Sequence, residues 1–111
     1  MNTRSADGWT PLGGLGGISQ LILGGALDET AKAGHRTRLV RFESGAQTTE
    51  PFVHDYWEEV FVVSGTLIDA DGTVSAPGNF VRRPPGLVHG PFNSPEGCEL
   101  FEVHYYERLV P

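Results

Sequence analysis

Two histidines and one carboxylate carry the most specific chemistry in this sequence. His54 precedes Glu58 by four residues in the stretch "FVHDYWEE", and His89 follows later in "GLVHGPF". Imidazole nitrogens and carboxylate oxygens together suit first-row divalent metal ions. The first hypothesis is therefore a metal site. The alternative is that His54 and Glu58 are only polar residues at the solvent-exposed end of a strand.

The spacing of His54 and Glu58 constrains how they could meet. On one continuous strand they would lie about 13 Å apart. Pro51 and the valine-rich run at 60–63 argue against a helix that would bring them together. We therefore expect a strand, a tight connection through residues 55–57 and a returning strand. Cross-strand neighbours lie about 5 Å apart, which is close enough for both side chains to reach one ion.

A second stretch, "GNFVRRPPGLVHGPFN", places His89 after a turn. Pro84, Pro85 and Gly86 in succession favour a tight turn before a new strand. Such a turn would direct His89 back toward the interior of a barrel, and small barrels hold one small ligand inside.

Both stretches resemble the two conserved motifs of the cupin superfamily. The resemblance implies a jelly-roll barrel and a divalent metal held by His54, Glu58 and His89. The short segment between the motifs is similar to that of small single-domain cupins. The first motif is matched by His54, Glu58 and Gly65, and the second by Gly78, Pro84, Gly86, His89 and Asn93.

One position departs from the cupin pattern. The family has a further histidine where this chain has Phe52. His104, in "ELFEVHYYE", is a candidate replacement as a fourth ligand. Period-two alternation places Leu100, Glu102 and His104 on one face of a strand. The alternative is that the opposite face, with Phe101, Val103 and Tyr105, is the buried one, and that Glu102 and His104 face water.

Three further residues are candidates for substrate binding. Phe52 and Trp57 would form an apolar wall if they face the site, and as core aromatics they need no other role. Arg82 shares a strand face with Phe80 and could hold an anionic substrate, although a solvated surface arginine is the simpler interpretation.

The remaining sequence predicts an all-β chain. Many glycines and prolines separate short runs rich in Val, Phe, Leu and Thr, which is typical of an antiparallel sandwich or barrel. Asp69-Ala70-Asp71-Gly72 predicts a hairpin turn, and "ALDETAKAG" could form at most a turn or two of helix. The predicted strands lie at 19–24, 36–43, 51–57, 59–69, 73–84 and 98–109.

Length and similarity to small cupins predict one domain over residues 1–111. We expect residues 1–34 to form an N-terminal arm with strands, and residues 35–111 to form the barrel core with both motifs. The segment "GGISQLILGG", residues 16–25, is apolar and is a candidate interface for a homodimer.

Composition excludes several classes of partner. A net charge of -6 among 111 residues argues against nucleic acid, which needs a basic surface. No apolar stretch is long enough for a membrane span, and the N-terminus is not that of a signal peptide. Cys98 is the only cysteine, so no intramolecular disulfide can form, which fits a cytoplasmic protein.

The resemblance implies three hypotheses for function. The first is a metal-dependent dioxygenase acting on a small ketone or diketone, since both motifs are similar to those of diketone-cleaving cupins; its catalytic residues beyond the metal ligands are unassigned. The second is a redox-neutral cupin isomerase, lyase or cyclase. The third is a non-catalytic cupin that senses zinc or a ligand, similar to the cupin domain of zinc-binding anti-sigma factors. Iron or manganese is favoured as the metal, with zinc or nickel as alternatives.

Overall fold

The computed structural model describes residues 1–13 and 15–107, and in this part of the chain it contains strands and no helix that could cross a membrane. The strands form two antiparallel sheets, with orders β1-β2-β3-β10-β5-β8 and β4-β9-β6-β7. The all-β prediction is therefore confirmed. The strands are β1 (Thr10–Pro11), β2 (Ile18–Asp28), β3 (Ala33–Phe42), β4 (Ala46–Gln47), β5 (Trp57–Gly65), β6 (Leu67–Ile68), β7 (Val74–Ser75), β8 (Phe80–Arg83), β9 (Asn93–Ser94) and β10 (Cys98–Tyr105).

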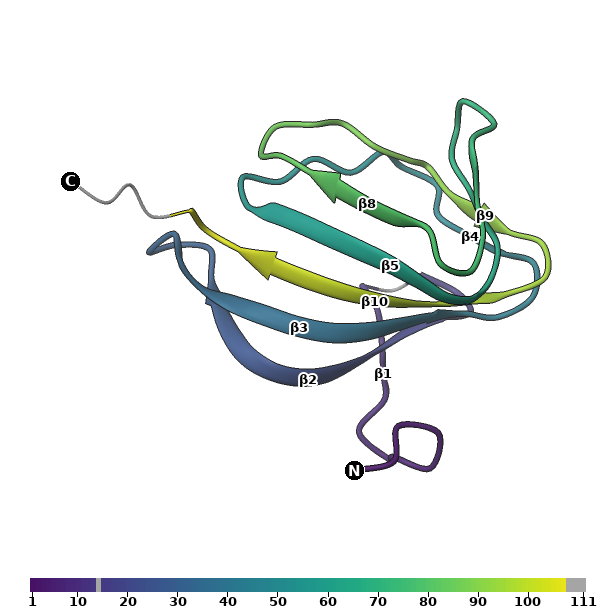
Figure 1. Cartoon of the computed structure of the whole chain (residues 1–111), viewed down its shortest axis with the longest axis horizontal. Coiled ribbons are helices and arrows are strands. Elements are labelled where there is room, and N and C mark those ends of the chain that lie inside the picture. Colours follow the sequence, from purple (N-terminus) through teal and green to yellow (C-terminus); the bar gives the residue numbers. More distant parts are fainter. Residues whose placement is uncertain (14, 108–111) are drawn as a thin grey trace.

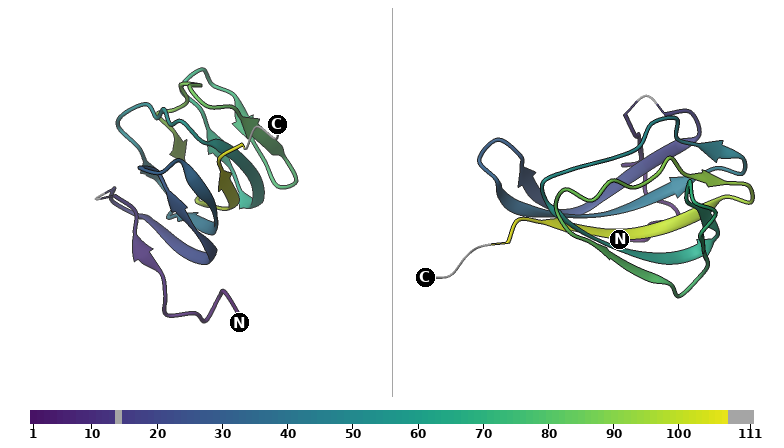
Figure 2. Two further views of the ribbon diagram at one scale, coloured as in Figure 1. Left: turned by 90° about the vertical axis from the view of Figure 1, so that its left-hand side faces the viewer. Right: turned by 90° about the horizontal axis from the view of Figure 1, so that it is seen from above.

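The long strands of the larger sheet lie side by side, and the short strands of the second sheet fold over one end of them (Figure 1). Seen along other directions, the two layers curve around a common interior (Figure 2). The space between the layers is where side chains from both sheets meet.

Most predicted strands are present, although the runs at 59–69 and 73–84 each divide into two strands, β5 with β6 and β7 with β8. One run forms no strand. The run at 51–57 is not a strand, since only Phe52 forms a bridge, with His89, and β5 begins at Trp57. The run at 98–109 forms β10, and its last residues lie outside the described part of the chain, as do Gly14 and the end of the predicted barrel core. "ALDETAKAG" forms a turn at 29–32, and the hairpin turn at 69–72 joins β6 to β7 as predicted.

The central strands alternate between buried and exposed residues, as period-two geometry requires. Along β5, Glu58, Val60 and Val62 are buried, whereas Phe61 and Val63 are exposed. Along β10, Leu100, Glu102 and His104 are buried. The expectation that Glu102 and His104 face inward is therefore confirmed, and the alternative that they face water is wrong.

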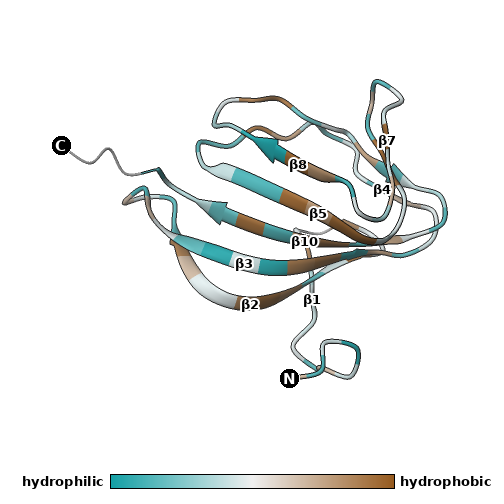
Figure 3. Cartoon of the chain, in the orientation of Figure 1, coloured by the Kyte–Doolittle hydropathy of each residue, from teal (hydrophilic) through white to brown (hydrophobic). Residues whose placement is uncertain are grey.

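Strands β3, β5 and β8 each have a polar half and an apolar half. On β3 the residues Arg36 and Arg38 precede the buried Val40 and Phe42, and on β5 Glu58 precedes Val60. Figure 3 shows this as hydrophilic left-hand and hydrophobic right-hand halves of β3, β5 and β8. The interior consequently has one polar end and one apolar end.

The strand register aligns the charged residues across the sheet. Arg36 of β3 is opposite His104 of β10, His104 is opposite Glu58 of β5, and Glu58 is opposite Arg83 of β8. Residues directly opposite in antiparallel strands have Cβ atoms about 4.5–5.5 Å apart. Four strands therefore contribute one continuous transverse row of polar side chains.

An apolar core supports this row at the other end of the sheets. It contains Ile18, Val40, Phe42, Val60, Val62, Leu67, Phe92, Cys98 and Leu100. Gly65 ends β5 with a φ of 70°, and a Cβ there would lie 1.9 Å from the carbonyl oxygen of Gly97. Only glycine fits this position, which gives a structural reason for the last residue of the first motif.

Candidate metal centre

A cavity of about 330 Å³ lies between the two sheets. This volume falls in the range of small-molecule sites in proteins. Its apolar end includes residues of the N-terminal segment, among them Leu12 and Leu15. The charged and histidine residues that line it are Arg36, Arg38, His54, Glu58, Arg83, His89 and Glu102.

Main-chain hydrogen bonds join the two motifs at the polar end. The N–H groups of Phe52 and His89 each donate to the other residue's carbonyl oxygen, at 2.7 and 2.9 Å. The N–H of Gly86 donates to the carbonyl of His54 at 2.8 Å. Gly86 has a φ of 83°, so the Pro84–Gly86 turn needs glycine at this position. The turn predicted to direct His89 inward is thus bonded to the segment that carries His54.

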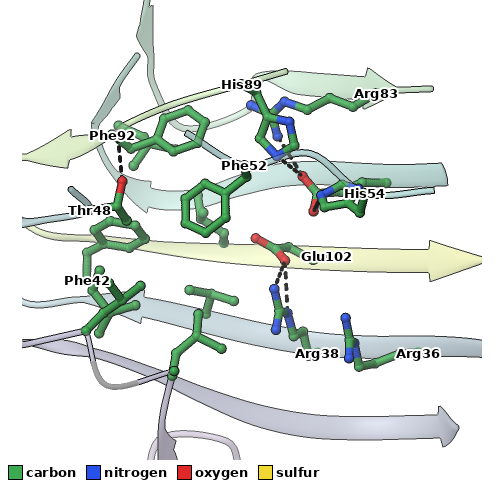
Figure 4. Close-up of a pocket in the computed structure, with 18 of the residues that line it drawn as sticks. Arg36, Arg38, Phe42, Thr48, Phe52, His54, Arg83, His89, Phe92 and Glu102 are labelled. Carbon is green, nitrogen blue, oxygen red and sulfur yellow. Dashed lines mark hydrogen bonds and ion pairs between the residues drawn. The ribbon is translucent and has the colours of Figure 1, made fainter. Parts of the chain in front are cut away.

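The first three predicted ligands converge on one point in the cavity. Glu58 Oε2 lies 3.5 Å from His54 Nε2, and Glu58 Oε1 lies 3.9 Å from His89 Nε2. Candidate ligand atoms of the three residues all lie within 4.8 Å of one another. Figure 4 shows His54 and His89 close together at one end of the cavity, away from Phe42. The sequence grouped these residues correctly, although His54 lies on a loop and not on a strand.

The side-chain hydrogen bond of His89 leaves its other ring nitrogen free to bind a metal ion. Its Nδ1 lies 3.1 Å from the carbonyl oxygen of Leu87, which can only accept, so Nδ1 carries the proton. The lone pair is then on Nε2, the nitrogen that faces Glu58. Burial lowers the pKa of His89, which keeps the ring neutral. Metal-binding histidines are commonly oriented by such a bond from the second nitrogen.

His54 has an uncommitted nitrogen. Its Nδ1 is a buried side-chain atom with no hydrogen-bond partner in the described part of the chain. The ring is held by stacking on Tyr56, with ring centroids 4.1 Å apart and an angle of 4° between the planes. A buried polar atom without a partner is costly. The nitrogen that faces Glu58 Oε2, at 3.5 Å, is the other one, Nε2.

Glu58 is held as a carboxylate. Burial favours its neutral form, but hydrogen bonds from His104 and His54 and the nearby positive charge of Arg83 together place the pKa of Glu58 well below its ordinary value. Arg83 Nη1 donates to Glu58 Oε1 at 2.8 Å. The centre therefore provides an anionic oxygen between the imidazoles of His54 and His89.

His104 is close to this centre but lies behind it. The ring is completely buried and does not line the cavity. Arg36 donates to its Nδ1 from Nε at 3.0 Å and from Nη2 at 2.7 Å. Because a guanidinium can only donate, Nδ1 must accept and Nε2 must carry the proton. That proton points to Glu58 Oε2 at 3.0 Å and to Glu102 Oε1 at 3.1 Å.

This arrangement gives His104 a role that the sequence did not suggest. In the observed bonding it orients Glu58, and its Nε2 would have to lose a proton to become a ligand. His104, Glu58 and Glu102 nevertheless form a second group whose candidate ligand atoms lie within 4.8 Å. The assignment of His104 as a fourth ligand stays a prediction.

The substrate-binding candidates divide between the two faces of the sheet. Phe52 lines the cavity and stacks between His89 and Phe92, with centroid distances of 5.9 and 6.3 Å. Trp57 and Arg82 do not line the cavity. The Arg82 guanidinium lies 4.2 Å from the Trp57 ring centre and is exposed, because both residues occupy the outward-facing positions of their strands.

Sequence reasoning missed three charged residues of the cavity, and it placed Glu102 on the face of His104 without assigning it a role. The three, Arg36, Arg38 and Arg83, became visible only through the strand register. Arg38 binds Glu102 with its Nη2 2.9 Å from Oε1, and it also donates to Gln20. Period-two alternation puts Arg83 on the same strand face as Val81 and on the opposite face from Arg82. The sequence alone does not say which of the two arginines faces inward.

The residues present fit a divalent metal ion. Two donors bound to one ion at about 2.0–2.2 Å each lie at most about 4.4 Å apart. The distances from Glu58 to His54 and to His89 satisfy this limit. The lone pair of His89, the Nε2 of His54 and the ionised Glu58 supply the donor chemistry.

Comparison with known proteins places this geometry among cupins. The family of ChrR cupin-like domains matches residues 2–106. An RmlC-like cupin from Shewanella frigidimarina has 22% identity and a TM-score of 0.74, with 97% of this chain and 90% of that chain covered. A search of curated proteins found no match. The cupin jelly-roll prediction is confirmed.

Two further solved structures share the fold and differ in function. The anti-sigma factor ChrR of Rhodobacter sphaeroides, in complex with SigE, has 20% identity and a TM-score of 0.67, with 92% of this chain and 50% of that chain covered. An acetylacetone dioxygenase from Acinetobacter johnsonii has 15% identity and a TM-score of 0.73, with coverage of 95% and 73%. Relatives of this shape therefore include both a regulator and an oxygenase.

Proposed function

We propose, from the premise that the chain belongs to the family of ChrR cupin-like domains, that it is a metal-dependent dioxygenase acting on a small ketone or diketone. The proposed cofactor is one iron or manganese ion held by His54, Glu58 and His89. The observation that carries the proposal is this donor set, two imidazoles and one carboxylate, at one end of a cavity of substrate size.

The donor set supports the oxygenase branch specifically. Two histidines and one carboxylate on one side of a metal ion are the ligands of many non-haem iron oxygenases, in which positions remain open for substrate and oxygen. When bound, the ion would supply redox chemistry and polarise a substrate carbonyl. Replacement of the family's further histidine by Phe52 fits a site with fewer protein ligands and more open positions.

The remaining cavity residues would act by binding and by excluding water. Phe52 and Phe92 cover one side of the centre and keep that side apolar. Arg83 and His104 hold Glu58 from two directions through their hydrogen bonds to its two oxygens. The carboxylate is thereby fixed before any ion or substrate arrives, which is the preorganisation that catalytic sites require.

A second candidate function is ligand or zinc sensing. The observation that favours it is the family itself, because the ChrR cupin-like domain takes its description from an anti-sigma factor. A sensing domain would use the same residues to hold zinc and would show no turnover. The two candidates therefore differ in which metal is bound and in whether oxygen is consumed.

Oxygen uptake by iron-loaded protein separates these functions. Purified protein, reconstituted anaerobically with Fe²⁺, is supplied with air-saturated buffer and a panel that includes acetylacetone, other small diketones and hydroxy-ketones. We expect oxygen uptake that matches substrate loss. Glu58→Gln removes the anionic ligand and should abolish uptake, whereas Glu59→Gln changes the same charge at an outward-facing neighbour and should leave uptake intact.

Other outcomes redirect or reject the proposal. Substrate loss that continues without oxygen would identify redox-neutral chemistry. Tight zinc with no turnover of any compound would support sensing. Equal uptake by wild type and Glu58→Gln would contradict the assignment of this centre.

A further inference from the structure

The polar end of the cavity has an excess of positive charge. Three arginines and two carboxylates line it, the arginines at positions 36, 38 and 83 and the carboxylates at 58 and 102. The whole chain, in contrast, has a net charge of -6. A divalent cation at His54, Glu58 and His89 would increase the positive excess further. Buried charge of one sign calls for a counter-charge.

The excess positive charge can be assigned to Arg36. Arg38 pairs with Glu102 and Arg83 pairs with Glu58, at 2.9 and 2.8 Å. Arg36 forms no ion pair with any described residue, and its contacts are the neutral atoms His104 Nδ1 and Tyr56 Oη. No protein acceptor in the described ranges binds its Nη1. A half-buried guanidinium in a cavity is therefore left without an anionic partner.

Tyr56 places a second donor beside Arg36. The Arg36 Nη2 group donates to Tyr56 Oη at 3.4 Å, so the phenol accepts this bond and its own proton remains available. Both residues line the cavity. A guanidinium N–H and a phenol O–H side by side match the two oxygens of a carboxylate.

The opposite end of the cavity is apolar. Phe42, Val40 and Leu100 lie further along the strands that carry Arg36 and Glu102, and Phe92 lies across from them. In Figure 4 the labelled Arg36 and Arg38 project from β3 into the cavity, whereas Phe42 and Phe92 lie at its other end. A ligand that spans the cavity meets a cation at one end and hydrocarbon at the other.

We infer that the substrate is an oxo acid, a small ketone that carries a carboxylate and an apolar body, and that Arg36 with Tyr56 binds its carboxylate. This inference names the substrate class of the function proposed above and so rests on it. Arg36 is a specificity-determining residue in this account, because it discriminates a charged ligand from its uncharged analogue. Its contact with His104 also links the bound anion to the residue that orients Glu58.

A matched pair of probes tests the inference directly. 4-Methyl-2-oxopentanoate carries a carboxylate where 5-methylhexane-2,3-dione carries an acetyl group, and the two are otherwise the same. Their affinities are measured by isothermal titration calorimetry on metal-free and metal-loaded protein. We expect wild type to bind the acid at least about tenfold more tightly than the dione in both states, as charge-assisted hydrogen bonds predict.

Variants identify the residue responsible for this preference. Arg36→Gln should bring the two affinities to within about threefold of each other, Arg36→Lys should retain part of the preference, and Tyr56→Phe should reduce it. Arg82→Gln is the matched control, because it removes the same charge from the outer face, and the wild-type preference should persist. Circular dichroism spectra and metal content establish that each variant is folded and loaded.

The outcomes distinguish this inference from the proposed function. Failure of wild type to prefer the acid in either metal state overturns the inference. If Arg36→Lys and Arg36→Gln both keep the preference, but only when metal is present, then the ion binds the carboxylate. This result also overturns the inference. Absence of metal binding rejects the proposed function, while the metal-free titration still decides whether Arg36 selects a carboxylate.

Discussion

At the scale of single residues, the protonation of the histidines distinguishes ligands from supporting residues. His89 donates from Nδ1 to the Leu87 carbonyl and presents a lone pair to the centre. His104 has the reverse arrangement, because Arg36 donates to its Nδ1 and Nε2 donates to carboxylates. Two histidines close to the same glutamate therefore differ in function: His89 presents a lone pair to a metal ion, whereas His104 donates a hydrogen bond to Glu58.

Replacing His104 tests this distinction. In His104→Gln we expect metal affinity to fall by about 10- to 100-fold, as is usual when a residue that orients a ligand is lost. The measurement is a competition titration with a chromophoric chelator. His35→Gln, at an exposed position of β3, is the control and should bind as wild type does. Complete loss of binding in His104→Gln would instead establish His104 as a ligand.

The candidate ligands could be predicted from sequence, but their surroundings could not. His54 with Glu58 and His89 lie in two short stretches that resemble the two cupin motifs, and this resemblance grouped them. Arg36 meets His104 only through the pairing of β3 with β10, far apart in sequence. The choice between Arg82 and Arg83 depended on the facing of one short strand.

At the scale of elements, alternation along the strands positions the site. Strand β5 supplies Glu58 at its first inward position and valines at the next two. The predicted strand at 51–57 is instead a loop with a single bridge at Phe52, because Pro51 has no N–H to donate and the chain must turn before β5. His54 reaches Glu58 across this turn, so the predicted proximity holds although the predicted strand does not form.

The alternation of β5 predicts that the same substitution has unequal effects on stability at two adjacent positions. Val62 is 2% exposed and Val63 is 46% exposed. Val62→Ala should lower the free energy of unfolding by about 2 kcal/mol, since it removes buried methyl groups and leaves a cavity. Val63→Ala should change it by less than about 0.5 kcal/mol. Urea denaturation followed by tryptophan fluorescence measures both, and equal effects would contradict the assigned facing of β5.

At the scale of the whole molecule, the N-terminal segment contributes to the cavity and the core. Leu12 and Leu15 pack against the core, and Ile18 and Leu21 of β2 are buried. The segment at 16–25 was predicted to form a homodimer interface. Much of its apolar surface is already used within the chain, with Ile22 as an exposed exception at 45%. The homodimer stays a prediction.

The charged row at the polar end of the interior is the feature that makes a metal site reasonable in this chain. Binding of an ion to the folded chain alone stabilises it in proportion to the logarithm of metal concentration. The charged row across four strands would thereby change from a cost into a contribution to stability. The metal centre is thus the central claim on which both the function and the substrate class depend.

The most direct test of this claim is the metal content of the protein purified without chelators or a nickel affinity step, measured by mass spectrometry of the elements. Wild type should hold close to one equivalent of iron or manganese per chain, and His89→Ala should hold little. The His35→Gln control should match wild type. A wild-type protein that contains no first-row metal, and binds none on addition, would contradict the account.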